Sequence, residues 1–399
     1  MKTSVRLLIL SAALAAGAHA APFLAVSDNS EVFLTGKLGV RQDSNIFLTH
    51  NAVSDTIWDI DPGFQFVFGN TSAAKGTFSA TENLTAYSSH SDLNTNLLSS
   101  AFDIAYEDGK TKASFDASYD ELNQNTYNIN GSGSSLTTSD LLIRRNVTDV
   151  GTKGEVAVTE KTSVGAGVTF GRTDYRLKAF SDADVLTIPL NYFYEVTPKL
   201  EASAGYTYRA TWQQLYADSV DNFYNVGVRG EITPKLSGTI NAGLTDRRFS
   251  GKYSQKYNLG SASLFGVSSN LTYTVSPKAT IQFGIDNDFD TNAQGRQEKD
   301  LSANIGGILA LAEDWTVDAK VTWRSIHYAN NDTSYPDHKD TFWDTSVGVT
   351  YKVNAVVGIT ASVAYRKNDS GQGTGETSAI ATSRSFEQNV FSLAANFRY

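Results

Sequence analysis

Charged side chains recur at every second position in many segments of the chain. One segment carries Glu201 and Arg209 on one face, and another carries Asp318, Lys320 and Arg324. The residues between them are mostly apolar. Fixed charges of both signs spaced in this way can set up an electric field across a water-filled space and select among ions, but they do not form a catalytic set.

Catalytic and metal-binding motifs are missing from the sequence. It has five histidines without a His-x-x-x-His pair, no cysteine and no Gly-x-Ser-x-Gly elbow. Asp286, Asp288 and Asp290 resemble the start of a calcium loop, but Thr291 and Gln297 stand where that loop needs Gly and Glu. We therefore predict no enzyme activity, no metal site and no cofactor. The acidic stretch is expected to be a solvated external loop, with a loosely held external cation as the alternative.

The alternation itself predicts β-strands that have one apolar and one polar face. It is strict over residues 315–324 and 357–366, and again over residues 391–399, where the chain ends on an aromatic residue. Charged side chains are costly on a lipid-facing wall, so the polar face must be the inner one. The predicted fold is an all-β, transmembrane, antiparallel up-and-down β-barrel. A large soluble β-sandwich is the alternative, but these strands are long for soluble sheets.

This alternation assigns side chains to the two faces of the wall. The pore-lining candidates are Lys37, Arg41, Lys112, Asp116, Glu201, Arg209, Arg229, Glu231, Asp318, Lys320, Arg324, Asp344 and Arg366. The aromatic residues expected at the lipid interface are Trp212, Trp315, Trp323, Tyr351 and Tyr399. The same reasoning places Arg172 inward. Trp315 and Trp323 lie on one row, roughly 26 Å apart along a strand, which matches two aromatic girdles.

Short turns and longer polar loops alternate along the chain. Short turns are expected near residues 70–75, 107–110, 160–162, 197–200, 233–236, 276–279, 312–315 and 352–355. Longer loops are expected at residues 122–139, 174–184, 215–220, 250–255, 291–298, 329–340 and 369–383. Outer-membrane barrels have short periplasmic turns and long external loops. The pattern predicts about 18 strands, with 16 as the second choice.

The amino-terminal residues have the pattern of a secretory signal. Lys2 and Arg6 precede an apolar run, and Ala18-His-Ala20 is a typical cleavage site. We predict a signal peptide at residues 1–20 that is cleaved after Ala20, a short periplasmic segment at residues 21–30 and a barrel at residues 31–399. This division leaves no room for a plug before the barrel. The net charge of −9 argues against nucleic acid as a partner.

The first hairpin carries a short motif that points to a known family. The chain reads Asp43-Ser-Asn45-Ile-Phe, then Ser54-Asp-Thr, then Pro62-Gly63. These residues resemble a family of outer-membrane β-barrel porins that also includes barrels from exopolysaccharide loci. The resemblance implies a barrel but says little about cargo, and Gln42 stands where such motifs often carry a second polar or acidic residue. Asp43 and Asn45 are expected to satisfy backbone groups at a turn, and Pro62-Gly63 to mark a bulge or bend.

These observations favour a porin-like channel in the bacterial outer membrane for passive diffusion of small hydrophilic solutes. The alternatives are the barrel component of exopolysaccharide export and a structural or adhesive barrel. The expected partners are outer-membrane lipids, small hydrophilic solutes and the barrel-assembly machinery, which would recognise the C-terminal strand. A homotrimer is a further hypothesis. Loop 122–139 is the third external loop, and it is therefore a candidate for folding inward, with a flexible surface loop as the alternative.

Overall fold

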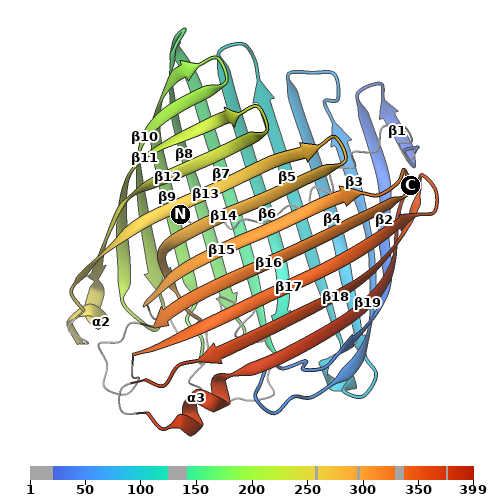
Figure 1. The fold of residues 1–399 in the computed structure, drawn as a ribbon, viewed down its shortest axis with the longest axis vertical. Coiled ribbons are helices and arrows are strands. Elements are labelled where there is room, and N and C mark those ends of the chain that lie inside the picture. The colour runs from blue at the N-terminus through green and yellow to red at the C-terminus, as the bar shows by residue number, and fades with distance from the viewer. Residues whose placement is uncertain (1–20, 125–141, 257–258, 294–296, 329–336, 374–375) are drawn as a thin grey trace.

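A closed ring of antiparallel strands forms the whole wall of the molecule (Figure 1). The computed structural model describes residues 21–124, 142–256, 259–293, 297–328, 337–373 and 376–399. The predicted signal peptide lies outside these residues. The ring consists of the 18 strands β2 to β19, and each pairs with its neighbours in chain order. The prediction of an 18-stranded up-and-down barrel is therefore confirmed.

The strands are long, as a membrane wall requires. The first half of the ring consists of β2 (Ser30–Asp43), β3 (Asp55–Phe68), β4 (Ala74–Tyr87), β5 (Thr95–Glu107), β6 (Thr111–Gln124), β7 (Ile143–Thr159), β8 (Thr162–Tyr175), β9 (Ala183–Thr197) and β10 (Leu200–Gln213). The second half consists of β11 (Asp218–Thr233), β12 (Leu236–Ser250), β13 (Ser261–Ser276), β14 (Ala279–Thr291), β15 (Gln297–Ala310), β16 (Trp315–Tyr328), β17 (His338–Lys352), β18 (Val357–Ser370) and β19 (Phe386–Arg398).

The two ends of the barrel differ in their connections. Tight turns join alternate strand pairs at one end, and longer loops join the others at the opposite end. Helices α2 (Gly251–Lys256) and α3 (Ser378–Arg384) and the short helix η1 (Ser91–Leu93) belong to the longer connections. Figure 1 shows α2 and α3 at one end, and the C-terminus toward the other. None of the helices among the described residues is long and apolar enough to cross a membrane.

The outer face of the ring is rich in exposed apolar side chains. Trp212, Trp315, Tyr351 and Tyr399 are exposed on it. Trp323 lies on the same row as Trp315, opposite another tryptophan of β17. The indole of Trp315 and the ring of Tyr351 pack together with their centroids 4.7 Å apart. The outer wall therefore has the apolar surface and the aromatic side chains that a lipid-facing wall needs.

Closure of the barrel depends on the last strand. β19 pairs with β2 in a continuous register that includes Leu393 opposite Val40 and Phe397 opposite Gly36. Beyond this ladder the backbone N–H of Tyr399 donates to the Leu34 carbonyl at 2.9 Å. A Cβ atom on Gly36 would lie 2.0 Å from the Phe397 ring, so the ring needs a glycine beneath it. The expected pairing of the terminal strand with the first strand is confirmed.

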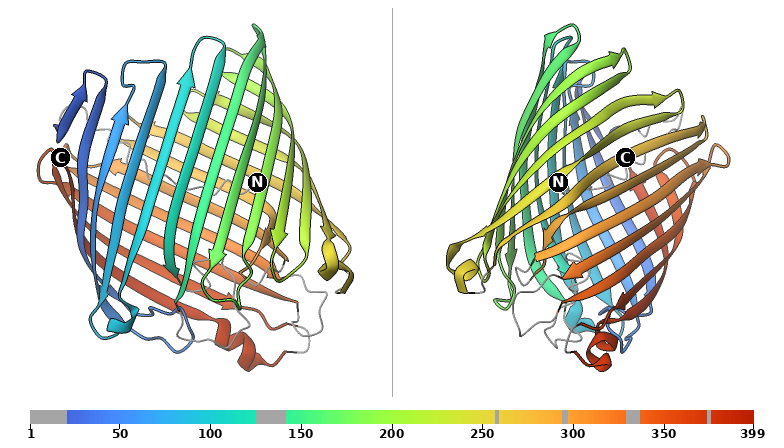
Figure 2. Two further views of the ribbon diagram at one scale, coloured as in Figure 1. Left: turned by 180° about the vertical axis from the view of Figure 1, so that it is seen from behind. Right: turned by 60° about the vertical axis from the view of Figure 1, so that its left-hand side comes forward.

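One short strand lies outside the ring. β1 (Leu24–Ser27) pairs with the start of β2, with Ala25 opposite Glu31. It covers the edge of β2 at the tight-turn end, where β19 does not reach (Figure 2). The sequence suggested only a short periplasmic segment here. The strand was missed because its pairing partner is a free edge that exists only after the ring has closed.

The Asp-x-Asn motif ties the loop after β2 to the last strand. The Asn45 side chain donates to the Thr49 carbonyl at 2.7 Å and to the Glu387 carbonyl at 3.0 Å, and its oxygen accepts from the Thr49 N–H. The Asp43 carboxylate accepts from the Asn45 N–H at 2.8 Å and from the Gln388 amide. These contacts support a structural role for the motif at the external end of the closure seam.

Asn45→Ala should weaken this seam. The substitution removes three hydrogen bonds of a buried side chain and leaves backbone groups without partners, so we expect a loss of about 2–3 kcal/mol in unfolding free energy. Asn51→Ala is the matched control, because only the backbone carbonyl of that exposed residue takes part in the loop's bonding. Urea titrations of the barrel folded in lipid vesicles would measure both variants. Equal stability of the two would contradict the role assigned to Asn45.

The Pro62-Gly63 expectation was wrong in one respect. β3 keeps an unbroken register with β2 through Pro62 and Gly63. On the other side, its pairing with β4 skips from Ile60 to Gly63 without a shift in register. There is no bulge. Proline lacks an N–H, and the sheet accommodates it by a local gap in one ladder rather than by an inserted residue.

Candidate channel lumen

Ion pairs that cross the interior identify the inner face of the ring. Arg229 on β11 donates from Nη1 and Nη2 to the Glu155 carboxylate on β7 at 2.7 and 2.6 Å. These strands are four positions apart, which is roughly 19 Å along the wall. Outward-pointing side chains would diverge, so both residues must point inward. The register then assigns every other residue of each strand to the same side.

The pore-lining candidates all share the inner side with Arg229. Each is connected to it by parity along its strand and by its ladder partners: Lys37, Arg41, Lys112, Asp116, Glu201, Arg209, Glu231, Asp318, Lys320, Arg324, Asp344 and Arg366. That they line the path of a solute is part of the proposal below. Their inward placement follows from strand alternation, which the sequence already contained.

Most of these candidates pair with a carboxylate or cation on a neighbouring strand or turn. Lys37 bonds to Asp61 at 3.2 Å and Arg366 to Asp344 at 3.3 Å. Arg41–Asp59, Lys112–Glu107, Glu231–Lys199 and Arg324–Asp300 are further pairs. Among the described residues, no ion pair is recorded for Asp116, Asp318 or Lys320. The inner wall therefore carries ion pairs that neutralise each other, together with a few charged side chains for which no ion pair is recorded.

Arg172 does not belong to this set. It lies opposite Thr148 and Asp184, on the row that points away from the lumen, and it pairs with Asp174 at 3.0 Å. The inward assignment was wrong. Near the external end of a strand, a charged side chain can lie on the outer wall because it is above the lipid. In this region the polarity of a residue therefore does not show whether its side chain points inward or outward.

One ion-pair bridge narrows the lumen in the half nearer the tight turns. Arg229 binds Glu155 across the interior and also Glu201 on the adjacent strand. Its guanidinium carbon lies 3.3 Å from the centroid of the Phe193 ring, and Ser163 donates to Glu155 at 2.7 Å. Beside this bridge is a cavity of about 360 Å³ lined by inward residues that include Lys112 and Lys153. The bridge could not be predicted from sequence, since its two ends are 74 residues apart.

The external end of β14 and β15 folds toward the opposite wall. β14 stops pairing with β13 after Asn287 but stays paired with β15 as far as Thr291. The Ser181 N–H, in the β8–β9 loop, donates to the Ala293 carbonyl at 2.8 Å. Ala293 also packs in a buried cluster with Ile143, Tyr175 and Phe180. The hairpin thus contacts strands on the far side of the ring and covers part of the external mouth.

A buried charge network holds this hairpin in place. Arg209 on β10 bonds to Asp221 and, across the interior, to Asp288 at 2.7 Å. Arg247 on β12 bonds to Asp221 at 2.6 Å and donates to the Asp290 carbonyl at 3.0 Å. The expectation of a solvated loop at this acidic stretch was wrong, because Asp288 is buried against arginine. Among the described residues, no group of three His, Cys, Asp or Glu side chains could hold a metal ion.

Most of the third external loop, which was predicted at residues 122–139 as a candidate for folding inward, lies outside the described part of the chain. Among the described residues, the hairpin between β14 and β15 folds inward, and Leu48 of the β2–β3 loop packs on the inward side chains Phe342 and Phe386. The sequence signal of the hairpin was the run of acidic residues, which marks a segment that needs cationic partners once it leaves water.

The external loop before β19 is fastened by another buried pair. Arg384 donates to both oxygens of Glu376 at 2.7 Å and to the Gly371 carbonyl at 3.2 Å. The Arg384 guanidinium, more strongly than the opposing effect of burial, holds the pKa of Glu376 below its usual range. The pair therefore stabilises the loop above the ordinary pKa of a glutamate. That contribution is lost as the pH falls through the lowered pKa.

The sequence of the barrel matches that of a known porin family. The model of a family described as "Putative beta-barrel porin 2" matches residues 35–385, which is most of the chain. The chain belongs to this family. The porin resemblance seen in the first hairpin is thereby confirmed, and the matched residues include nearly all of the ring. A porin-family barrel also fits the outer membrane as its location.

Two solved structures of Pseudomonas aeruginosa proteins align with most of the chain at low sequence identity. Pseudomonas aeruginosa OccK5 (OpdH) is 11% identical, with 95% of this porin and 100% of that chain covered and a TM-score of 0.48. OpdK of the same organism, solved with vanillate, is 10% identical, with 92% and 99% covered and a TM-score of 0.48. No curated protein matches the chain at a significant level. Family membership therefore rests on the family model.

Proposed function

We propose that this porin-family barrel is a passive diffusion channel for small hydrophilic solutes. The observation that carries the proposal is a closed ring of 18 strands whose inward rows are polar and charged. A barrel of this strand number is wide enough for an aqueous channel. Transport needs no cofactor or covalent step, only size exclusion at the bridged and covered regions and electrostatic selection along the wall.

The inward rows also suggest a charge preference. Acidic residues outnumber basic ones on the inward positions of the described strands. Because most basic residues there are paired, the net field inside the lumen is negative. We expect a modest preference for cations, with the single charges Asp116, Asp318 and Lys320 acting where no pair neutralises them.

Liposome swelling tests the proposal. Vesicles that contain the folded barrel should swell in isotonic solutions of small sugars, at rates that fall as the sugar becomes larger. Vesicles that contain the heat-denatured protein give the background rate. Swelling no faster than this background, with the barrel shown to be folded, would favour a structural or adhesive barrel instead.

The two ends of the chain would direct its export and its assembly into the outer membrane. A signal peptide at residues 1–20, cleaved after Ala20, would deliver the chain to the periplasm, where residues 21–30 would remain. The terminal strand would be recognised by the barrel-assembly machinery, because its outward row ends in Phe397 and Tyr399. A homotrimer is the remaining partner hypothesis, and mass photometry of the folded protein in detergent would measure it.

A further inference from the structure

A row of basic side chains crosses three neighbouring strands on the outer wall. Lys299 on β15 lies opposite His327 on β16, and His327 lies opposite Lys339 on β17. The ladders are continuous at this point, so the three side chains share one face. It is the outward face, because their row continues that of Trp323 and Trp343, which alternates with the inward row of Arg324.

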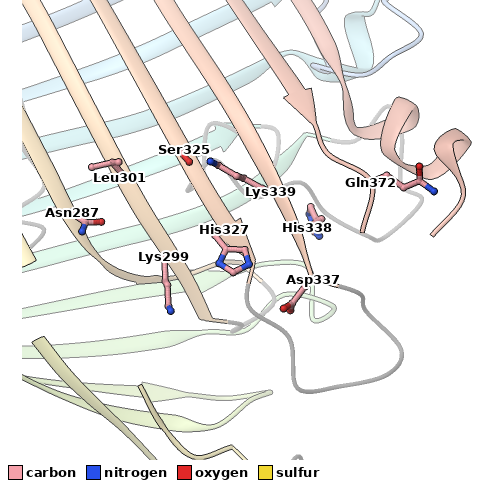
Figure 3. Close-up of a pocket in the computed structure, with 9 residues that line it drawn as sticks. All are labelled: Asn287, Lys299, Leu301, Ser325, His327, Asp337, His338, Lys339 and Gln372. Atoms are coloured by element: carbon pink, nitrogen blue, oxygen red, sulfur yellow. The ribbon is translucent and has the colours of Figure 1, made fainter. Parts of the chain in front are cut away.

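The row forms one side of a cavity of about 470 Å³ at the external end of these strands. Figure 3 shows Lys299, His327 and Lys339 coming from three separate strands around it. Leu301 and Ser325 line the part nearer the membrane. Asp337 adds one carboxylate, so the two lysines leave the lining with a net positive charge.

The height of the row corresponds to the headgroups of the external leaflet. Lys299 is four residues beyond Ala303, which pairs with Trp323 in the aromatic row. Four residues span roughly 13 Å of strand, or about 10 Å of height at the tilt usual for such barrels. Tryptophan marks the edge of the hydrocarbon region. Lysine side chains just beyond it face the polar part of the lipids.

Several basic residues elsewhere on the outer rim are neutralised by neighbouring acids. Arg144 pairs with Glu121 at 3.2 Å, and Arg248 pairs with Asp246 at 3.0 Å. Lys367, on the strand next to Lys339, pairs with Asp369 and Glu387. No such partner is recorded for Lys299, His327 or Lys339 in the part of the chain that the structure describes. The two ammonium groups and the imidazole are therefore available to an external anion.

We propose that this cavity binds the phosphate groups of lipid headgroups in the external leaflet. Two ammonium groups and an imidazole donate hydrogen bonds to phosphate oxygens, while Leu301 contacts the apolar part of the same lipid. The three donor side chains are spread over three strands, so a bound headgroup would brace the wall beside the inward-folded hairpin. The inference uses the membrane location of the barrel and is independent of what passes through the lumen.

Binding of lipopolysaccharide to the folded barrel in detergent tests the proposal, with thermophoresis as the readout. The probes are purified lipopolysaccharide and the same material after enzymatic dephosphorylation. The test variant is Lys299→Gln/His327→Gln/Lys339→Gln. The control is Lys161→Gln/Lys235→Gln/Lys278→Gln, which removes lysines from tight turns at the opposite end. Inorganic phosphate serves as a competitor, to separate a lipid site from a site for soluble anions.

We expect the test variant to bind the phosphorylated lipid roughly 30-fold more weakly than the wild type. The control variant should bind like the wild type, and dephosphorylation should reduce wild-type binding to the level of the test variant. Equal binding by the test variant, or binding that survives dephosphorylation, would overturn the proposal. So would complete displacement by dilute inorganic phosphate. Swelling rates should be the same in all three proteins, which keeps this result separate from that of the channel.

Discussion

Removal of residues 397–399 should prevent the barrel from closing. These residues supply the last part of the β19–β2 ladder, the Phe397 ring over Gly36 and the Tyr399 bonds to Leu34. Without them, backbone groups of β2 would face lipid without partners, at a cost of several kcal/mol for each group. We expect the folded fraction to fall at least tenfold.

Refolding of the urea-unfolded chain into lipid vesicles measures this effect, with the heat-modifiable band on a gel as the readout. Deletion of residues 24–27 is the matched control, because β1 lies outside the ring and its loss should leave closure intact. Tyr399→Ala separates two roles of the terminus. Normal refolding in vitro together with poor assembly in cells would indicate recognition by the assembly machinery. Normal refolding of the truncated chain would contradict the closure model.

Arg229→Ala should widen the lumen and make it more selective for cations. The substitution removes the side chain that reaches from β11 to β7, and it leaves Glu155 and Glu201 without their cation. A unit charge at a few ångströms in water changes local ion energies by about 1 kcal/mol. We therefore expect the cation-to-anion permeability ratio to rise about two- to fivefold, together with a larger single-channel conductance.

Lys320→Ala is the matched control for Arg229→Ala. It also removes one inward positive charge, but no ion pair is recorded for Lys320 among the described residues, so no bridge is broken. Its effect should be limited to a smaller change in selectivity, with conductance close to that of the wild type. If Arg229→Ala left conductance unchanged in a correctly folded barrel, the bridge would not limit the path.

The strands and their closure could be predicted from the sequence because they depend on local alternation. In a strand such as residues 315–323, alternate side chains face opposite sides of the wall. Because the apolar row must face the lipid, the other row must face the lumen. The tight turns then fix the strand order, and the terminal strand has no partner left except the first one. The inward placement of Arg209, Arg229 and Lys320 follows from the same rule.

The contents of the lumen could not be predicted in this way. The Arg229–Glu155 bridge and the Ala293 contact join segments that are far apart in the chain. Their formation depends on the shape of the closed wall, which alternation does not describe. β1 and the outward position of Arg172 were missed for a related reason. At the rims of a barrel, lipid no longer decides which side chains face out.

Single-channel recording in planar lipid bilayers tests the central claim most directly. Purified, folded barrel should insert and give discrete, long-lived conductance steps that scale with salt concentration. In a salt gradient the reversal potential should have the sign of a modest cation preference. Folded protein that inserts without conducting would contradict the account.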